Sequence, residues 1–115
     1  MTLTKKIAKL FRKWSWLVTH WGWKFTVNYV ACSEDMPDGA GASMSTTSHH
    51  QYLQGLIWVN LKVCEGESDE MLEEMVVHEL CHLLLAPMAQ NPESEHEKEL
   101  TCTTIARCII GARGK

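Results

Sequence analysis

The sequence predicts one α+β domain over residues 1–115: an amphipathic helix, a small group of strands, and two further helices. Apolar residues in the first 18 positions recur at three- and four-residue steps, and those after residue 68 return to a helical pattern. Between them, residues 23–30 and 56–63 form short runs rich in aromatic and β-branched residues. With 115 residues, of which 45% are hydrophobic and 22% charged, a disordered or fibrous protein is excluded.

The first predicted helix covers residues 3–18. Its apolar stripe consists of Leu3, Ile7, Leu10, Phe11, Trp14, Leu17 and Val18. Such a helix could lie on a membrane surface, but a helix that covers one face of a small sheet has the same pattern, and we favour the second interpretation. Residues 23–30 (WKFTVNYV) then alternate as a strand does.

The middle of the chain predicts a loop and two more strands. Residues 33–42 are rich in Gly, Pro and acids and indicate a loop. Residues 43–50 are polar but compatible with an edge strand. Residues 56–63 (LIWVNLKV) are the strongest strand signal, with Gly55 before them and a Glu-Gly pair soon after.

Two helices are predicted at the end. Ser68 is the predicted N-cap of a helix over residues 69–86, because acids follow it in the first turn and Pro87 stops the pattern. An Asn-Pro pair opens the last helix, expected over residues 93–110 with its end near Gly111.

Charge and cysteine usage restrict the partners and the compartment. The net charge is −3, but residues 1–24 carry six bases and no acid, whereas residues 65–99 carry eleven of the fourteen acids and one base. The acidic half disfavours nucleic acid, and no apolar run approaches the ~18 residues of a membrane span, so neither partner is expected. A DNA-associated role for the basic start would require strongly salt-dependent binding. The five cysteines form no CxxC pair and no secretory signal is evident, which favours the cytoplasm.

The most informative residues are His78-Glu79-Leu80-Cys81-His82, the pattern HExxH. On a helix, two imidazoles four residues apart share one face and can both bind one Zn²⁺. Glu79 points to the neighbouring flank, where it can act as a general base without being a ligand. The surrounding segment is otherwise apolar, and burying these side chains there without partners would cost several kcal/mol. Cys81 is expected to face the core.

A catalytic zinc usually has a third protein ligand. The extended pattern HExxHxxGxxH is excluded, because Leu85 and Met88 stand where it requires Gly and His. The acids and the histidine of the last helix are therefore the candidates: Glu93, Glu95, His96, Glu97 and Glu99. Their positions relative to the apolar stripe of that helix, which includes Cys102 and Ala106, rank Glu99 first, Glu95 second and His96 third.

This order of elements, with VVHELCHLLL before an acidic helix, resembles the zincin metallopeptidases, and more narrowly the very small gluzincin-like proteins often encoded by phages and prophages. The resemblance implies a short, mostly antiparallel sheet, His78 and His82 as ligands, Glu79 as general base and Glu99 as third ligand. The SprT-like branch would instead imply His96. The resemblance also implies that residues 56–63 form the exposed edge that holds an extended peptide.

The expected function is a zinc metallopeptidase, a hydrolase that acts on a peptide or protein substrate, in the host cytoplasm if a phage encodes it. The alternative is a zinc-stabilised protein without catalysis, either a binding protein or a phage structural protein. Candidate oxyanion donors are His49, His50, Tyr52 and His96. The five tryptophans are expected in the core and at interfaces rather than as nucleic-acid stacking platforms.

Overall fold

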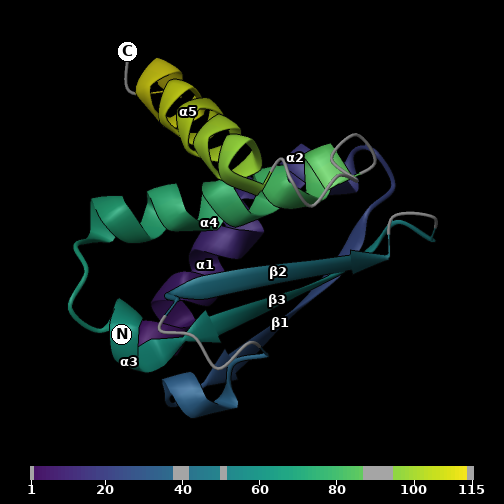
Figure 1. The fold of residues 1–115 in the computed structure, drawn as a ribbon. Coiled ribbons are helices and arrows are strands. Elements are labelled where there is room, and N and C mark those ends of the chain that lie inside the picture. The colour runs from purple at the N-terminus through teal and green to yellow at the C-terminus, as the bar shows by residue number, and fades with distance from the viewer. Residues whose placement is uncertain (1, 38–41, 50–51, 87–94, 114–115) are drawn as a thin grey trace.

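The computed structural model describes residues 2–37, 42–49, 52–86 and 95–113. It is an α+β fold in which helices pack on a three-stranded sheet, as the sequence predicts (Figure 1). In chain order the elements are α1 (Leu3–Trp14), α2 (Trp16–Thr19), β1 (Lys24–Val30), the 3-10 turn η1 (Ser33–Asp35), β2 (Met44–His49), β3 (Gln54–Asn60), α3 (Leu61–Cys64), α4 (Asp69–Leu85) and α5 (Glu95–Arg113).

The sheet has the order β1-β3-β2 and is mixed. β2 pairs antiparallel with β3, because a short connection joins them, whereas β1 pairs parallel with β3. The expectation of a mostly antiparallel sheet is therefore wrong. The expectation that residues 56–63 form the exposed edge is also wrong, since both edges of β3 are used in pairing. The edge strand that packs beside α4 is β2, from the segment 43–50.

β3 ends earlier than its apolar pattern predicts. Its last residue is Asn60, and the predicted strand positions that follow form the short helix α3. The fully buried Asn60 caps this helix, because its Oδ1 accepts a hydrogen bond from Val63 N (3.4 Å). Its Nδ2 donates to Ser33 Oγ (2.9 Å) and to the carbonyl of Ala42 (3.3 Å), which fastens the loop region to the end of β3.

The helices follow their predicted bounds with small differences. The predicted first helix is present as α1 and α2, with a break at Ser15, whose hydroxyl donates to the carbonyl of Arg12. Ser68 caps α4 as expected, because its Oγ accepts from Met71 N (3.1 Å). The last helix continues past the predicted end near Gly111, since that glycine does not adopt the left-handed conformation of a C-cap. Its predicted first residues, 93–94, lie outside the described residues.

The core lies between the helices and one face of the sheet. It contains Ile7 and Phe11 of α1, Ile57 and Val59 of β3, and much of α4. Trp14 and Trp23 belong to it, whereas Trp16 and Trp21 are exposed. No helix in the described part of the chain is long and apolar enough to cross a membrane.

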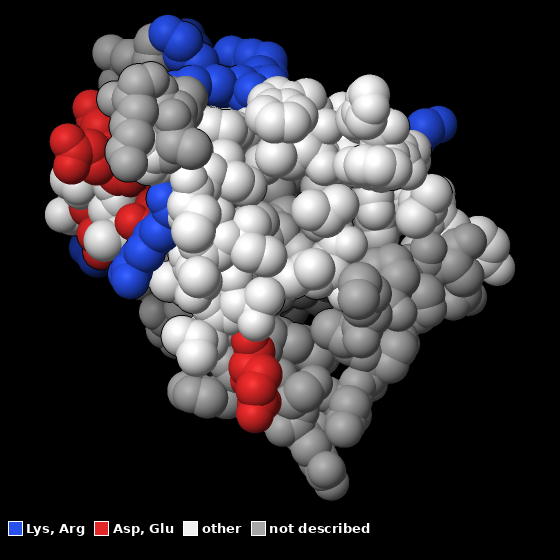
Figure 2. All heavy atoms as spheres, turned by 90° about the horizontal axis from the view of Figure 1, so that it is seen from above, with Lys and Arg blue, Asp and Glu red and all other residues white. Residues whose placement is uncertain are grey.

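The basic start and the acidic half of the chain neutralise each other in part. Lys6 Nζ lies 2.8 Å from Asp69 Oδ1, and Lys13 Nζ lies 2.6 Å from Glu73 Oε2, so both ion pairs join α1 to α4. Most of the described surface seen from above in Figure 2 is uncharged; Lys and Arg side chains gather at its upper margin, and others lie beside Asp and Glu side chains at the left. Part of the basic helix thus has an intramolecular role.

Gly55 of β3 lies directly beneath Leu83 of α4. A Cβ at this position would lie closer to Leu83 Cδ2 than real contacts allow. Gly55→Ala should therefore lower the free energy of unfolding by about 1–3 kcal/mol, as overpacked core positions do. Chemical denaturation measures this effect. Gly66→Ala is the control, because nothing lies within 4 Å of its added Cβ; equal stability changes in the two variants would contradict the close packing of β3 and α4.

Candidate metal centre

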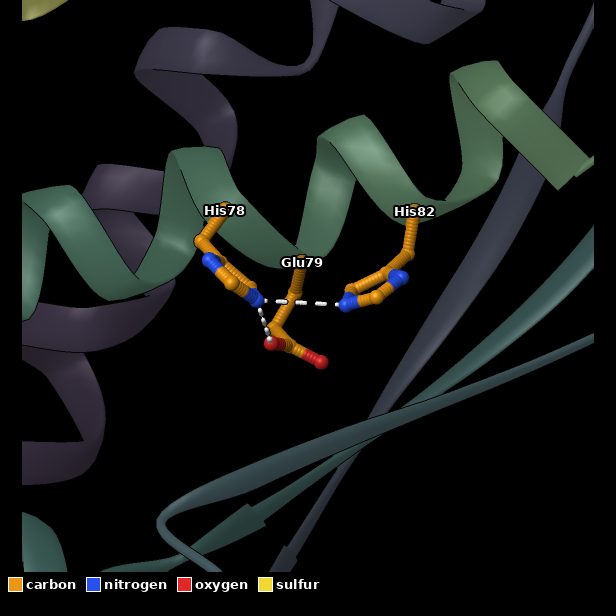
Figure 3. A group of neighbouring side chains, drawn as sticks. All are labelled: His78, Glu79 and His82. Atoms are coloured by element: carbon orange, nitrogen blue, oxygen red, sulfur yellow. Dashed lines mark hydrogen bonds and ion pairs between the residues drawn. The ribbon is translucent and has the colours of Figure 1, made fainter. Parts of the chain in front are cut away.

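α4 presents His78, Glu79 and His82 toward the space beside the sheet (Figure 3). Because the two histidines are four residues apart, their rings stand one turn apart on one helix face, and their Nε2 atoms are 3.1 Å from each other. The nearer carboxylate oxygen of Glu79, Oε2, is 3.7 Å from His78 Nε2. These three side chains offer nitrogen and oxygen atoms that could together hold a metal ion.

Glu99 approaches the same point from α5. Its Oε2 lies 3.0 Å from His78 Nε2 and its Oε1 lies 2.9 Å from His82 Nε2. The structure thus brings together the three residues that the sequence analysis ranked as ligands. Its side chain is 55% exposed and stands at the open side of the site.

The alternative third ligands are only partly described. Glu97 is exposed. Glu93 and the side chains of Glu95 and His96 lie outside the described residues. Among the described acids and histidines of α5, Glu99 is the residue that contacts the histidine pair.

The spacing of these atoms fits a small cation. A tetrahedral ion with bonds of ~2.0–2.1 Å holds its ligand atoms roughly 3.3 Å apart. The separations between the two histidine nitrogens and the Glu99 oxygens are 2.9–3.1 Å, within a few tenths of that value. Small rotations of the side chains would suffice to place them around one ion.

The sheet fixes the side chain of Glu79 beside the two histidines and Glu99. Its side chain is buried, with 7% of the residue exposed, and its Oε1 accepts a hydrogen bond from Thr46 Oγ1 of β2 (2.9 Å). Burial raises the pKa of Glu79, and Glu99 adds to this rise; His82, His78 and the Thr46 hydrogen bond act in the opposite direction. A carboxyl group with a raised pKa is better able to take up a proton.

A second hydroxyl contacts the site from α5. Thr103 Oγ1 lies 3.1 Å from His78 Nδ1. Sequence reasoning missed both Thr46 and Thr103. Thr103 could have been found, because it is one helical turn after Glu99 and so shares its face. Thr46 gave no such signal, since the face of a polar edge strand depends on its register.

Two buried thiols lie near the site but not as metal ligands. Cys81 and Cys102 belong to α4 and α5 and are buried, as expected for Cys81. Burial raises the pKa of Cys81 to about 11 and that of Cys102 to about 12. Because the thiolate is the metal-binding form, these cysteines act as apolar core residues.

Two cavities of about 340 Å³ flank the site. The first lies between α4, α5 and the start of β2, and its lining includes Met44, Met71, Met75, His78 and Thr103. The second lies along β2, and its lining includes Thr46, Glu79 and His82. Glu79 and Glu99 contribute to both, so the site is open to a molecule on either side.

The two candidate oxyanion donors that the structure describes, His49 and Tyr52, do not lie at the site. His49 is exposed and, being three residues from Thr46 on the same strand, lies on the opposite face of the sheet. Tyr52 is 69% exposed and lines neither cavity. His50 lies outside the described residues, as does the side chain of His96.

Glu99→Ala should weaken zinc binding by more than the ~10–100-fold typical of changes that only support a ligand, because a ligand itself is lost. A titration against a chromophoric zinc chelator measures this. Glu97→Ala, an exposed acid two residues earlier, is the matched control, and Glu95→Ala and His96→Ala should bind nearly as the wild type does. Wild-type affinity in Glu99→Ala with a loss in His96→Ala would favour the SprT-like arrangement.

The chain matches no protein-family model, no curated protein and no solved structure. The interpretation of the site therefore depends on the geometry of its own residues, above all His78, Glu79, His82 and Glu99.

Proposed function

We propose that this protein is a zinc-dependent peptidase, with His78, His82 and Glu99 as ligands and Glu79 as general base. One observation carries the proposal: two imidazole nitrogens and a carboxylate converge within 3.1 Å, while a second carboxylate stands beside them, buried and held by another element. A purely structural metal site would not require that second carboxylate. Zinc suits this set of two nitrogens and one oxygen donor and leaves a position for water.

Zinc bound there would supply a coordinated water of lowered pKa and would polarise the scissile carbonyl. The residues of the chain would supply the proton transfer. Glu79 would accept the proton of the attacking water and pass it to the leaving amine. The Thr46 hydroxyl donates a hydrogen bond to one oxygen of this carboxylate, Oε1, and the other oxygen, Oε2, is directed toward His78. Thr46 thereby orients the base.

The edge strand β2 is the proposed binding place for an extended substrate. Its pairing with β3 leaves its other edge without a strand among the described residues. A peptide that pairs with this edge would pass over Glu79, because Thr46 in the middle of β2 contacts it. Pairing through backbone hydrogen bonds depends little on the peptide sequence. Any preference for particular substrate side chains would therefore come from the two flanking cavities.

Metal removal tests the function against the non-catalytic alternative. Fluorescein-labelled denatured casein should be cleaved by the zinc-loaded protein, and a chelator followed by added zinc should abolish and then restore this cleavage. The cleavage products are identified by mass spectrometry. If the same products are absent with Glu79→Gln purified in the same way, a contaminating protease is excluded as their source. One bound zinc per chain without cleavage of casein or of a mixed peptide library would favour the zinc-stabilised binding protein.

A further inference from the structure

The imidazole of His78 is held at both of its nitrogens by α5. Nε2 lies 3.0 Å from Glu99 Oε2, and Nδ1 lies 3.1 Å from Thr103 Oγ1. Glu99 and Thr103 are four residues apart, so one face of α5 carries both partners. Rotation of the ring is thereby opposed from two directions.

The chemistry of the two partners differs in a way that matters for metal binding. A carboxylate only accepts hydrogen bonds, so an Nε2 that bonds Glu99 carries the hydrogen. In a neutral imidazole Nδ1 is then the acceptor, and the Thr103 hydroxyl donates to it. When Nε2 binds a metal, the hydrogen lies on Nδ1 and the hydroxyl must accept. A hydroxyl can serve both states by rotating, whereas a carboxylate in its place could only accept.

We propose that Thr103 is a positioning residue for the metal site, which keeps Nε2 of His78 directed at the ion and satisfies Nδ1 in both tautomers. This inference rests on the proposed function, because it requires Nε2 of His78 to be a ligand. Thr103 itself is not a ligand, since its hydroxyl faces the far side of the ring. Loss of this hydroxyl should weaken metal binding without removing a ligand atom.

The test is zinc affinity, measured by competition with a chromophoric chelator on the full chain. Thr103→Val keeps the shape and removes the hydroxyl, and should bind zinc ~10–100-fold more weakly. Thr103→Ser restores a hydroxyl and should bind within about threefold of the wild type, by the same reasoning. Thr104→Val is the matched control: Thr104 is exposed, and its hydroxyl donates to the carbonyl of Leu100 (2.9 Å) on the same helix. Circular dichroism of the metal-free variants confirms that each one is folded.

A second measurement determines which nitrogen of the His78 imidazole carries the hydrogen. In ¹⁵N-histidine-labelled protein, at a pH where the imidazoles are neutral, His78 should carry its hydrogen on Nε2 without zinc and on Nδ1 with zinc. Zinc affinity of folded Thr103→Val equal to that of the wild type, or an equal loss in Thr104→Val, would overturn the assignment of Thr103. A hydrogen on Nδ1 of His78 both with and without zinc would show that the Thr103 hydroxyl does not change from donor to acceptor. A wild-type protein that binds no zinc contradicts the proposed function itself, which separates the two failures.

Discussion

Replacing His78 or His82 by alanine should abolish tight zinc binding. The two Nε2 atoms are 3.1 Å apart and face the same Glu99 carboxylate, so either truncation leaves only one nitrogen and one carboxylate for the ion. If the ~10–16 kcal/mol of a four-ligand zinc site is divided evenly, each ligand contributes roughly 3 kcal/mol, which is a loss of more than ~100-fold per histidine. Zinc content after gel filtration and a chelator titration measure it.

The control for these variants is His49→Ala. His49 is exposed on the opposite face of the sheet and should have no effect on zinc content. Both site variants should remain folded, because His78 and His82 lie at the rim of the core and their removal leaves the packing of Leu80 and Leu83 intact. A full equivalent of zinc in either site variant would show that the metal binds elsewhere.

The sequence predicted the parts of the site that depend on local geometry. The i, i+4 spacing of His78 and His82 is a property of one helix, and the apolar residues around them indicated that helix without ambiguity. Ser68 marked its start, and the hydroxyl caps it as expected. The choice of Glu99 from the residues of the last helix also followed from helical periodicity, and its carboxylate does face the pair. Its role as a ligand stays a prediction.

Features that depend on contacts distant in sequence could not be predicted in this way. The order β1-β3-β2 is decided by pairing between strands, and a run such as residues 56–63 looks equally apolar at an edge or in the centre of a sheet. The exposure of Glu99 depends on how α5 packs against α4, which the sequence of α5 alone does not determine. The contact between Thr46 and Glu79 joins residues 33 positions apart and requires the register of β2.

Glu79→Gln should remove hydrolysis while zinc binding is kept. The amide has nearly the same shape, and its oxygen can still accept the hydrogen bond from Thr46, but it cannot take a proton from water. We expect kcat to fall by about 10²–10⁴-fold, the usual contribution of a general base. The zinc stoichiometry should be unchanged, because Glu79 is not one of the three proposed ligands. Retained cleavage in this variant would leave the mechanism without its base.

The same substitution should stabilise the metal-free protein at neutral pH. Burial raises the pKa of Glu79 above its value in the unfolded chain, so the folded state binds this proton more tightly. The resulting stability is present below the unfolded pKa and is lost as the pH rises through the folded pKa, whereas glutamine does not titrate. The melting temperature of metal-free Glu79→Gln should therefore exceed that of the wild type at pH 7, and the difference should shrink as the pH approaches ~4.

Glu70→Gln is the control for charge alone, because Glu70 is an exposed acid in the first turn of the same helix. The Glu70 carboxylate interacts favourably with the positive end of the helix dipole, so the variant that lacks it should be slightly less stable than the wild type. Opposite signs for the two substitutions would show that Glu79 is kept ionisable at a cost to the fold, as expected for a residue retained for chemistry. Equal destabilisation by both would instead assign Glu79 a structural role and contradict its selection as a base.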